Sequence, residues 1–449
     1  MTFRAELPVV VIGAGPVGLA AAAHLATREL EFLVIEASTG ASGHLRSTAH
    51  VPLFSPWKMN VDSAAMQLLE PLGWTPPNPE DKPTAGELCA QYLDPLARAL
   101  APRVRFDTRA VAISRRGYDK VKTIGREQAP FVVQTISDQG EDEIEARAVI
   151  DASGTWSKPN PIGVHGLPAR GELANAARIR YGMPDVLGAE RERYANKHVL
   201  VLGSGHSAAG CLISLAELAQ HEPRTRISWA LRSGNLQRIF GGGAKDGLPE
   251  RGKLGLTLRK LTDAGVLRVL SAFQVEAVSA DGGHLQVRGR SSDGAARMLE
   301  RVDEIIVATG SRPDLSLARE LRLKLDPWLE STEQLAPLID PNVHSCGSVP
   351  AHGHRELAHP EPGYYAIGAK SYGRAPNFLM ATGYEQARSV VAALAGDLAA
   401  ADSVQLVLPE TGVCSTDFID PETTNASCGT PKGGCCAPAK PASTRNGCC

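Results

Sequence analysis

The sequence predicts an α/β fold with two Rossmann-like doubly wound domains, one inserted into the other, and a flexible cysteine-rich C-terminal tail. Two copies of a glycine-rich turn, within residues 9–18 and 198–208, stand 190 residues apart on one chain. Each copy combines an apolar strand, a turn whose glycines let the backbone approach a pyrophosphate, and a helix whose N-terminus faces that anion. One G-x-G-x-x-G is weak evidence, but two copies with both flanks predict a protein that binds two dinucleotides.

The glycines and hydroxyl side chains of the two turns are the residues expected to hold the pyrophosphates. They are Gly13, Gly15 and Gly18 in the first turn, and Gly203, Ser204, Gly205 and Ser207 in the second. Pro16 suits the first helical turn, and residues 20–26 are rich in helix formers, which supports a helix after the first turn.

The residues that end the second strands distinguish the two ligands. The apolar run over 32–36 closes on Glu36, 23 residues past Gly13, where a carboxylate accepts hydrogen bonds from a ribose diol. This position favours the ADP half of FAD. The run over 227–232 closes instead on Arg232, which can pair with a 2′-phosphate and favours NADPH over NADH. The alternative for either residue is an ordinary solvated charge at a strand end.

Two further apolar strands end in a turn of a small residue, Ser or Thr, and glycine. They lie within residues 148–159 and 304–313 and contain Gly154 and Gly310. In two-dinucleotide-binding flavoproteins, such turns mark where the chain passes between the FAD and NADPH domains. The chain therefore resembles the superfamily of flavin-containing monooxygenases and pyridine-nucleotide flavoproteins over roughly residues 5–400, and most of all its bacterial FAD and NADPH monooxygenase-like branch.

The sequence departs from that family at two motifs. Residues 162–181 match poorly the F-x-G-x-x-x-H motif that identifies flavin-containing monooxygenases. A distal G-D motif, whose Asp meets the ribityl chain of FAD in relatives, is replaced within residues 365–370, which end in Gly-Ala-Lys. The resemblance thus implies membership of the superfamily outside the drug-oxidising subgroup.

The resemblance also implies further site residues. Leu45 and Arg46 lie where relatives place a segment over the flavin pyrophosphate, and Val111 is expected to meet the adenine through its backbone. Asn60 and Trp57 are the catalytic candidates: Asn60 would hydrogen-bond the flavin or its oxygen adduct, and Trp57 would form a wall beside it. The alternatives are a turn-forming asparagine and a core aromatic residue.

These patterns predict an FAD domain in two parts, over 1–165 and 301–400, with an NADPH domain over 190–300 inserted between them. The second FAD part closes with a helix over 380–398, and the tail covers 411–449. The chain has 449 residues, 43% of them hydrophobic, enough for full cores. A formal net charge of −2 gives no reason to expect nucleic-acid binding.

No apolar run reaches the length of a membrane span. The apolar start over 8–26 contains the glycine turn and lacks a basic leader, so it is expected to be a strand and helix rather than a signal peptide. The sequence thus predicts a cytoplasmic protein with a small-molecule or metalloid substrate, and it leaves the oligomeric state open.

Six of the nine cysteines lie in the tail: Cys414, Cys428, Cys435, Cys436, Cys448 and Cys449. Adjacent pairs suit tetrahedral zinc poorly, and structural disulfides are disfavoured in a reducing compartment. Soft ions such as As(III), Hg(II) or Cu(I) prefer two or three thiolates, so a metalloid site is the favoured interpretation. The alternative is a surface tail with incidental cysteines or a redox buffer.

The core contains no C-x-x-C or C-x4-C dithiol, since Cys89, Cys211 and Cys346 stand alone. We therefore expect electrons on FAD to pass to O2, or to a dithiol brought by the tail. The resemblance implies an FAD-dependent NADPH monooxygenase in which a flavin C4a-(hydro)peroxide oxidises a soft nucleophilic centre.

The tail makes trivalent arsenic, as arsenite or methylarsenite, the first candidate for that centre, and flavoproteins encoded with bacterial arsenic-resistance genes are similar in combining such a core with a cysteine-rich end. Three alternatives remain open. They are an N- or S-oxygenase of small organic molecules, a metalloid-sequestering protein with a non-catalytic flavin core, and a reductase of Hg(II) or a disulfide.

Overall fold

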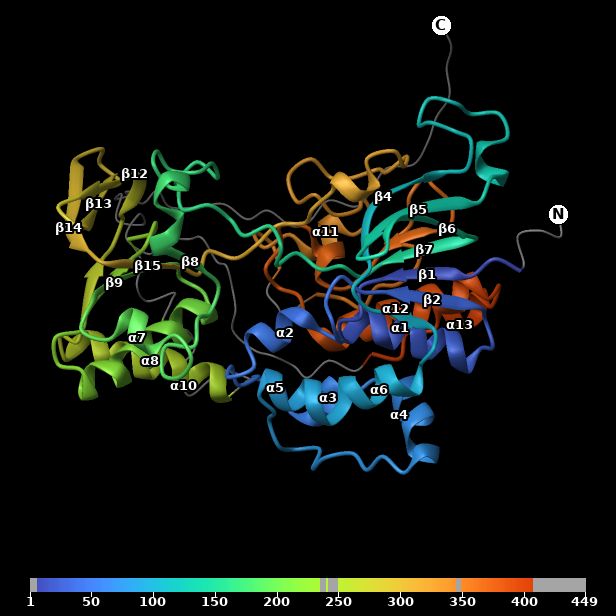
Figure 1. Ribbon diagram of the computed structural model, residues 1–449, viewed down its shortest axis with the longest axis horizontal. Coiled ribbons are helices and arrows are strands. Elements are labelled where there is room, and N and C mark those ends of the chain that lie inside the picture. Colours follow the sequence, from blue (N-terminus) through green and yellow to red (C-terminus); the bar gives the residue numbers. More distant parts are fainter. Residues whose placement is uncertain (1–5, 235–239, 241–248, 345–348, 407–449) are drawn as a thin grey trace, which may run out of the picture. The chain divides into compact units, whose positions relative to one another are not determined.

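The computed structural model describes residues 6–234, 240, 249–344 and 349–406. All of them lie in the first of the two units into which the chain divides, Met1–Ser415. These residues form two five-stranded parallel sheets and two three-stranded antiparallel sheets (Figure 1). The predicted α/β class with two Rossmann-like units is confirmed.

The first parallel sheet contains the first glycine turn. In spatial order its strands are β16 (Tyr364–Ala366), β7 (Ala148–Asp151), β1 (Val9–Ile12), β2 (Phe32–Ile35) and β3 (Val104–Arg105). Alternate residues of β1 serve different cores because side chains alternate across a strand. Val9 and Val11 share a core with the helices α1 (Pro16–Thr27) and α12 (Met380–Leu394), which lie side by side (Figure 1).

The other face of this sheet packs against antiparallel strands. Val10 and Ile12 share a core with residues of β4 (Arg109–Arg115), β5 (Phe131–Ser137) and β6 (Gly140–Ala146). Both faces of β1 are thus covered, which explains why the sequence of this strand is uniformly apolar.

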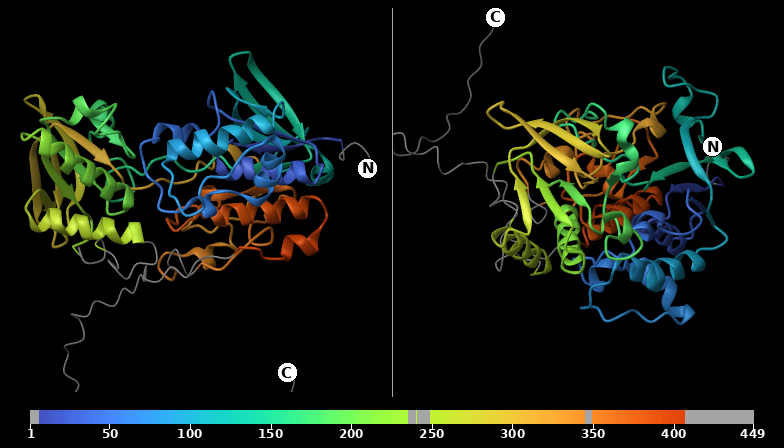
Figure 2. Two further views of the ribbon diagram at one scale, coloured as in Figure 1. Left: turned by 90° about the horizontal axis from the view of Figure 1, so that it is seen from below. Right: turned by 60° about the vertical axis from the view of Figure 1, so that its left-hand side comes forward.

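The second parallel sheet repeats this construction. Its strands in spatial order are β11 (Leu267–Leu270), β10 (Arg226–Ala230), β9 (His198–Leu202), β15 (Glu304–Val307) and β8 (Ile179–Tyr181). One face is covered by α8 (His206–His221) and α10 (Pro249–Asp263), and the other by β12 (Gln274–Asp281), β13 (His284–Arg290) and β14 (Ala296–Val302) (Figure 2).

The chain order shows an insertion, because the first sheet takes its strands from both sides of the second in the sequence. The second sheet draws strands from residues 179–307, a wider span than the predicted 190–300. The difference arises because two strands outside the predicted range pair in this sheet. β8 precedes the glycine turn in the sequence, and β15 follows the antiparallel strands. The domain limits themselves stay a prediction.

Short helices complete the described chain. The remaining α-helices are α2 (Gly43–Ser47), α3 (Trp57–Asn60), α4 (Ser63–Leu69), α5 (Ala85–Leu88), α6 (Asp94–Ala99), α7 (Arg191–Tyr194), α11 (Ala336–Ile339) and α13 (Leu398–Asp402). The remaining helical turns are η2 (Glu70–Leu72), η3 (Cys89–Leu93), η4 (Arg126–Gln128), η5 (Leu173–Arg178), η7 (Ser316–Ala318) and η8 (Gly368–Tyr372).

The closing helix ends earlier than predicted. It stops at Leu394 because Gly396 has a φ of +83°, and α13 begins at Leu398. No helix in the described part of the chain combines the length and apolar character needed to cross a bilayer.

Candidate active site

The first glycine turn connects β1 to α1 at the carboxyl edge of the first sheet. Gly13 has a φ of +99°, and a Cβ there would lie 2.8 Å from the carbonyl oxygen of Ala152. A Cβ on Gly18 would lie 2.0 Å from the carbonyl oxygen of Gly13, whereas one on Gly15 meets nothing within 4 Å. The turn is therefore closed toward the protein and open above Gly15.

The N-terminus of α1 is available to an anion. Gly15 is its N-cap, no side chain caps it, and its first turn contains no acidic residue. Uncapped N–H groups and the positive end of the helix dipole favour a phosphate at this position. The open space above Gly15 and the uncapped helix together fit the pyrophosphate of FAD.

Glu36 follows β2 directly and lies beside this turn. Its Oε2 accepts a hydrogen bond from the amide of Ala14 at 2.7 Å, and its Oε1 accepts one from the amide of Ser38 at 2.9 Å. The remaining lone pairs of the carboxylate can accept ribose hydroxyls. The structure thus brings Glu36 to the first turn, as its expected role in FAD binding requires.

The segment expected over the flavin pyrophosphate forms α2. Leu45 packs against the first core, and Arg46 donates from Nε to the carbonyl of Ala41 at 2.8 Å and pairs with Asp94. The His44 ring stacks on Trp156, with centroids 4.5 Å apart and planes 9° apart. Burial lowers the pKa of His44, which favours a neutral imidazole at neutral pH.

Trp156 belongs to the turn that follows β7. A Cβ on Gly154 would lie 3.3 Å from Cδ1 of this indole, so Gly154 permits the close approach of Trp156 to its own turn. The stack therefore joins α2 to the turn after β7, two segments at the carboxyl edge of the first sheet.

The two catalytic candidates lie inside the protein. The Asn60 side chain is fully buried, its Nδ2 donates to the carbonyls of Ser55 and Pro56 at 2.8 and 3.1 Å, and its Oδ1 accepts from Ser55 Oγ at 2.7 Å. These bonds match the alternative of a turn-forming residue. Trp57 is 4% exposed and shares the first core. Roles for Asn60 and Trp57 at the flavin stay predictions.

Val111 occupies an irregular position in β4. The register between β4 and β5 shifts between Ala110 and Ala112, so Val111 has no partner residue in β5. A bulged residue offers its backbone groups to a ligand. This geometry is compatible with the expected contact between the Val111 backbone and adenine.

The second glycine turn repeats the first. Gly203 has a φ of +134°, and a Cβ there would lie 2.3 Å from the carbonyl oxygen of Ala308. Gly205 is the N-cap of α8, whose first turn has no acid and no side-chain cap, and a Cβ on it meets nothing within 4 Å. Ser204 and Ser207 are exposed on this turn. A dinucleotide pyrophosphate fits here for the same physical reasons.

Arg232 is exposed and follows β10 by two residues, at the carboxyl edge that carries the second turn. Gly310 ends the turn after β15, where the amide of Asn160 donates to its carbonyl at 2.9 Å. The structure thus places the predicted NADPH residues along one sheet edge. The six tail cysteines, Cys414, Cys428, Cys435, Cys436, Cys448 and Cys449, lie outside the described residues.

A buried ion pair at the first sheet edge was not predicted from the sequence. Asp151 ends β7 with its side chain fully buried, and its Oδ2 accepts from Lys370 Nζ at 2.6 Å and from Tyr364 Oη at 3.2 Å. Lys370 also donates to Ser153 Oγ at 3.0 Å. This network fixes the turn against which Gly13 packs.

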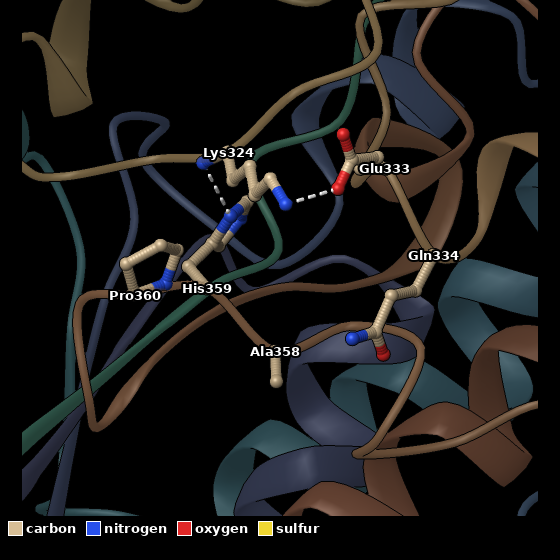
Figure 3. Close-up of a pocket in the computed structure, with 6 residues that line it drawn as sticks. All are labelled: Lys324, Glu333, Gln334, Ala358, His359 and Pro360. Carbon is tan, nitrogen blue, oxygen red and sulfur yellow. Dashed lines mark hydrogen bonds and ion pairs between the residues drawn. The ribbon is translucent and has the colours of Figure 1, made fainter. Parts of the chain in front are cut away.

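Two cavities lie away from the glycine turns. One of about 240 Å³ is lined by Lys324, Glu333, Gln334, Ala358, His359 and Pro360 (Figure 3). Burial lowers the pKa of His359 to about 4, and its ring contacts Tyr364, the first residue of β16. This cavity therefore lies at the amino end of that strand, opposite the nucleotide edge. The other, of about 420 Å³, lies beside Trp57.

Comparisons with known proteins agree with this geometry. The sequence profile described as pyridine nucleotide-disulphide oxidoreductase matches residues 7–361. Among curated proteins, none matches the sequence significantly. Three similar solved structures are a bacillithiol disulfide reductase from Bacillus cereus, a cadaverine monooxygenase of desferrioxamine biosynthesis from Erwinia amylovora, and an ornithine hydroxylase from Pseudomonas aeruginosa.

These structures share the fold with this chain at low sequence identity. The reductase has a TM-score of 0.64 at 17% identity and covers 87% of this chain and 99% of its own. The cadaverine monooxygenase, solved with FAD, has 0.63 at 13% and covers 91% and 98%. The ornithine hydroxylase has 0.58 at 17% and covers 87% and 99%.

Proposed function

We infer that this chain, which belongs to the pyridine nucleotide-disulphide oxidoreductase family, is an NADPH-dependent flavin oxidoreductase with FAD and NADPH as cofactors. We propose that it acts as a monooxygenase on a soft nucleophilic centre. The observation that carries the assignment of two dinucleotide cofactors is the pair of open, uncapped glycine turns at the ends of two parallel sheets. When bound, FAD would supply the redox chemistry between NADPH and O2.

The chain itself has the task of positioning the cofactors. The first turn and Glu36 would hold the ADP half of FAD, and the second turn would hold the NADPH pyrophosphate. Arg232 would select the 2′-phosphate by a charge-assisted hydrogen bond. No catalytic triad is needed, because this chemistry requires the protein to orient the reactants and exclude water.

The choice of O2 over a disulfide as acceptor is supported by the described cysteines. Cys89 and Cys211 are 1% and 2% exposed. Burial raises the pKa of both thiols, that of Cys211 to about 12. A protonated, buried thiol is a poor nucleophile, so neither residue suits thiol-disulfide exchange. Cys346 lies outside the described residues.

We further propose trivalent arsenic, as arsenite or methylarsenite, as the substrate centre. The support is the sequence of the tail, in which vicinal cysteines offer the thiolates that As(III) prefers. Thiolates also protect As(III) from oxidation, so the tail would capture and deliver the metalloid rather than retain it.

Steady-state kinetics of the purified full-length protein test this function. NADPH oxidation and O2 consumption are measured with arsenite, methylarsenite, a small amine and a thioether. We expect trivalent arsenicals to stimulate both rates together. Arsenic is excluded as substrate if neither arsenical stimulates turnover, and the monooxygenase proposal fails if stimulated turnover continues without O2.

N-oxygenation of a small amine is the second candidate. The cadaverine monooxygenase and the ornithine hydroxylase share this fold over most of the chain, which favours it as the alternative. Stimulation by an amine, with no response to arsenicals, would select it. Turnover of a disulfide under anaerobic conditions would instead select the reductase chemistry of the bacillithiol enzymes.

A further inference from the structure

A buried glutamine in α12 holds the turn that follows β16. Gln386 is 0% exposed, and its Oε1 accepts a hydrogen bond from the Gly368 amide at 2.7 Å. Its Nε2 donates to Ser371 Oγ at 2.9 Å and lies 2.8 Å from His352 Nε2. Ser371 in turn donates to the Gly368 carbonyl at 2.8 Å. One side chain thus connects the backbone of this turn to a buried histidine.

The turn at Gly368 lies at the sheet edge that carries the first glycine turn. β16 and β7 are parallel, and the amide of Ile367 donates to the carbonyl of Asp151 at the end of β7. Gly368 has a φ of +69°, and a Cβ there would lie 3.4 Å from the side chain of Val17, in the first turn of α1. A displacement of Gly368 would therefore reach the helix whose N-terminus faces the FAD pyrophosphate.

Two backbone groups fix the protonation of this network. A carbonyl oxygen only accepts, so His352 carries its proton on Nδ1, which donates to the Pro350 carbonyl at 3.0 Å. A backbone N–H only donates, so the Gly368 amide holds Oε1 of Gln386 on its own side and turns Nε2 toward the histidine. His352 Nε2 must therefore accept the hydrogen bond from Gln386, which only a neutral imidazole can do.

A second proton on His352 leaves no satisfied arrangement. In the present orientation, the Nε2–H of an imidazolium would face the amino group of Gln386, with the two nitrogens 2.8 Å apart. Turning the Gln386 amide over gives the imidazolium an acceptor but places the amino group against the Gly368 amide, across 2.7 Å. In either case a buried donor loses its acceptor, which is costly away from water. Protonation of His352 thus favours displacement of the Gly368 turn.

The surroundings of His352 favour the neutral form. His352 is 3% exposed, and its ring centroid lies 5.6 Å from that of Tyr372. Burial lowers the pKa of His352 below its ordinary 6.5, although the Pro350 carbonyl and the carboxylates of Glu356 and Glu385 act in the opposite direction. The network is therefore complete at neutral pH, and it is lost as the pH falls through the lowered pKa.

We propose that Gln386 is a positioning residue that holds the Gly368 turn for FAD while His352 is neutral, and that protonation of His352 weakens FAD binding. The proposal rests on FAD being the cofactor of the proposed function. Since the FAD-bound turn requires a neutral imidazole, release of FAD in acid is accompanied by uptake of a proton at His352 Nε2.

Titration of the FAD-free protein with FAD tests this coupling without measuring turnover. Flavin fluorescence gives the dissociation constant between about pH 8 and about pH 5. We expect a constant value above the ordinary histidine pKa and a rise of about tenfold in acid, the factor that corresponds to one hydrogen bond of a buried group. Calorimetry in two buffers of different ionisation enthalpy should show that FAD binding in acid releases a proton.

Two substitutions assign the effect to this network. His352→Gln keeps an acceptor for Gln386 but cannot titrate, so it should bind FAD as the wild type does at neutral pH and lose the weakening in acid. Gln386→Glu offers oxygen acceptors to both the Gly368 amide and an imidazolium, so it should bind FAD at least as tightly in acid as at neutral pH. The matched control is the exposed His165→Gln, which should keep the wild-type profile.

Each outcome decides a separate question. A wild type that binds FAD equally well across the pH range overturns the proposal, as does weakening in acid that persists in His352→Gln or in Gln386→Glu. If neither variant folds, calorimetry of the wild type decides, and binding in acid without proton release overturns the proposal. A wild-type protein that binds no FAD at any pH would refute the flavoprotein function itself.

Discussion

Glu361→Gln tests the buried charge cluster of the FAD-binding unit. The side chains of Glu361, Arg115 and Arg126 are at most 1% exposed. Glu361 accepts hydrogen bonds from Arg115 Nε at 2.8 Å, Arg126 Nη1 at 2.5 Å and the Arg322 amide at 3.0 Å. Glutamine keeps the shape but removes the negative charge that Glu361 places between two buried guanidinium groups. We expect the free energy of unfolding to fall by about 3–5 kcal/mol.

The effect should depend on pH with a defined sign. Burial by itself raises the pKa of Glu361, but the Arg322 amide and the Arg126 and Arg115 side chains outweigh it and hold the pKa below its ordinary 4.5. A carboxyl whose pKa is lowered in the folded state stabilises the fold above its unfolded pKa, and this contribution is lost as pH falls through the folded pKa. The difference between wild type and variant should thus be complete at neutral pH and shrink in acid.

Urea unfolding followed by circular dichroism measures both effects. Glu145→Gln is the matched control, because the pair of Glu145 with Arg116 has side chains 41% and 43% exposed. An exposed pair contributes about 0–1 kcal/mol. The reasoning is refuted if Glu361→Gln costs no more than Glu145→Gln, or if its cost grows as the pH is lowered.

Three further predictions concern the cofactors and the tail. Arg232→Ala should lower kcat/KM for NADPH about 10- to 100-fold and leave that for NADH unchanged, while Arg226→Ala at the exposed start of β10 changes neither. Gly18→Ala should prevent FAD binding because its Cβ would lie 2.0 Å from the Gly13 carbonyl oxygen. A Cβ on Gly15 would meet nothing within 4 Å, so Gly15→Ala should preserve the thermal stability of the FAD-free protein but weaken FAD binding about tenfold. Thermal melts and FAD titrations distinguish this variant from Gly18→Ala. A variant ending at Glu410 should show a raised KM for arsenite with a smaller change in kcat, and equal kinetics would exclude delivery by the tail.

The sequence predicted those parts of the fold that depend on local patterns. A buried strand, a glycine turn and a helix start lie within ten residues of each other, so both nucleotide turns could be recognised without tertiary information. The negative charge of Glu36 after β2 and the positive charge of Arg232 after β10 could likewise be interpreted from the position of each residue after its strand. The α/β class is confirmed for this reason, and the family match over residues 7–361 agrees with the two nucleotide turns.

Side-chain roles in the inserted segment were harder to predict. The sequence shows that Asn60 follows a proline-containing loop, but only the folded chain shows that Ser55 and Pro56 use its amide groups. Gln386 gave no sequence signal at all. Its proposed role arises from hydrogen bonds with Gly368 and His352, residues that only the folded chain brings together.

The pair of Asp151 and Lys370 lies beside the distal glycine motif at which the sequence departs from the family resemblance. Alanine stands where the G-D motif has aspartate after that glycine, and the sequence alone indicated only that this carboxylate is lost. In the fold, β16 pairs with β7, and this brings Lys370 to Asp151 across 219 residues of sequence. A buried lysine or aspartate without its partner would be strongly destabilising, so each residue requires the other. The carboxylate at this edge thus comes from β7 and is held by a cation from the segment after β16, a dependence that no local pattern could reveal.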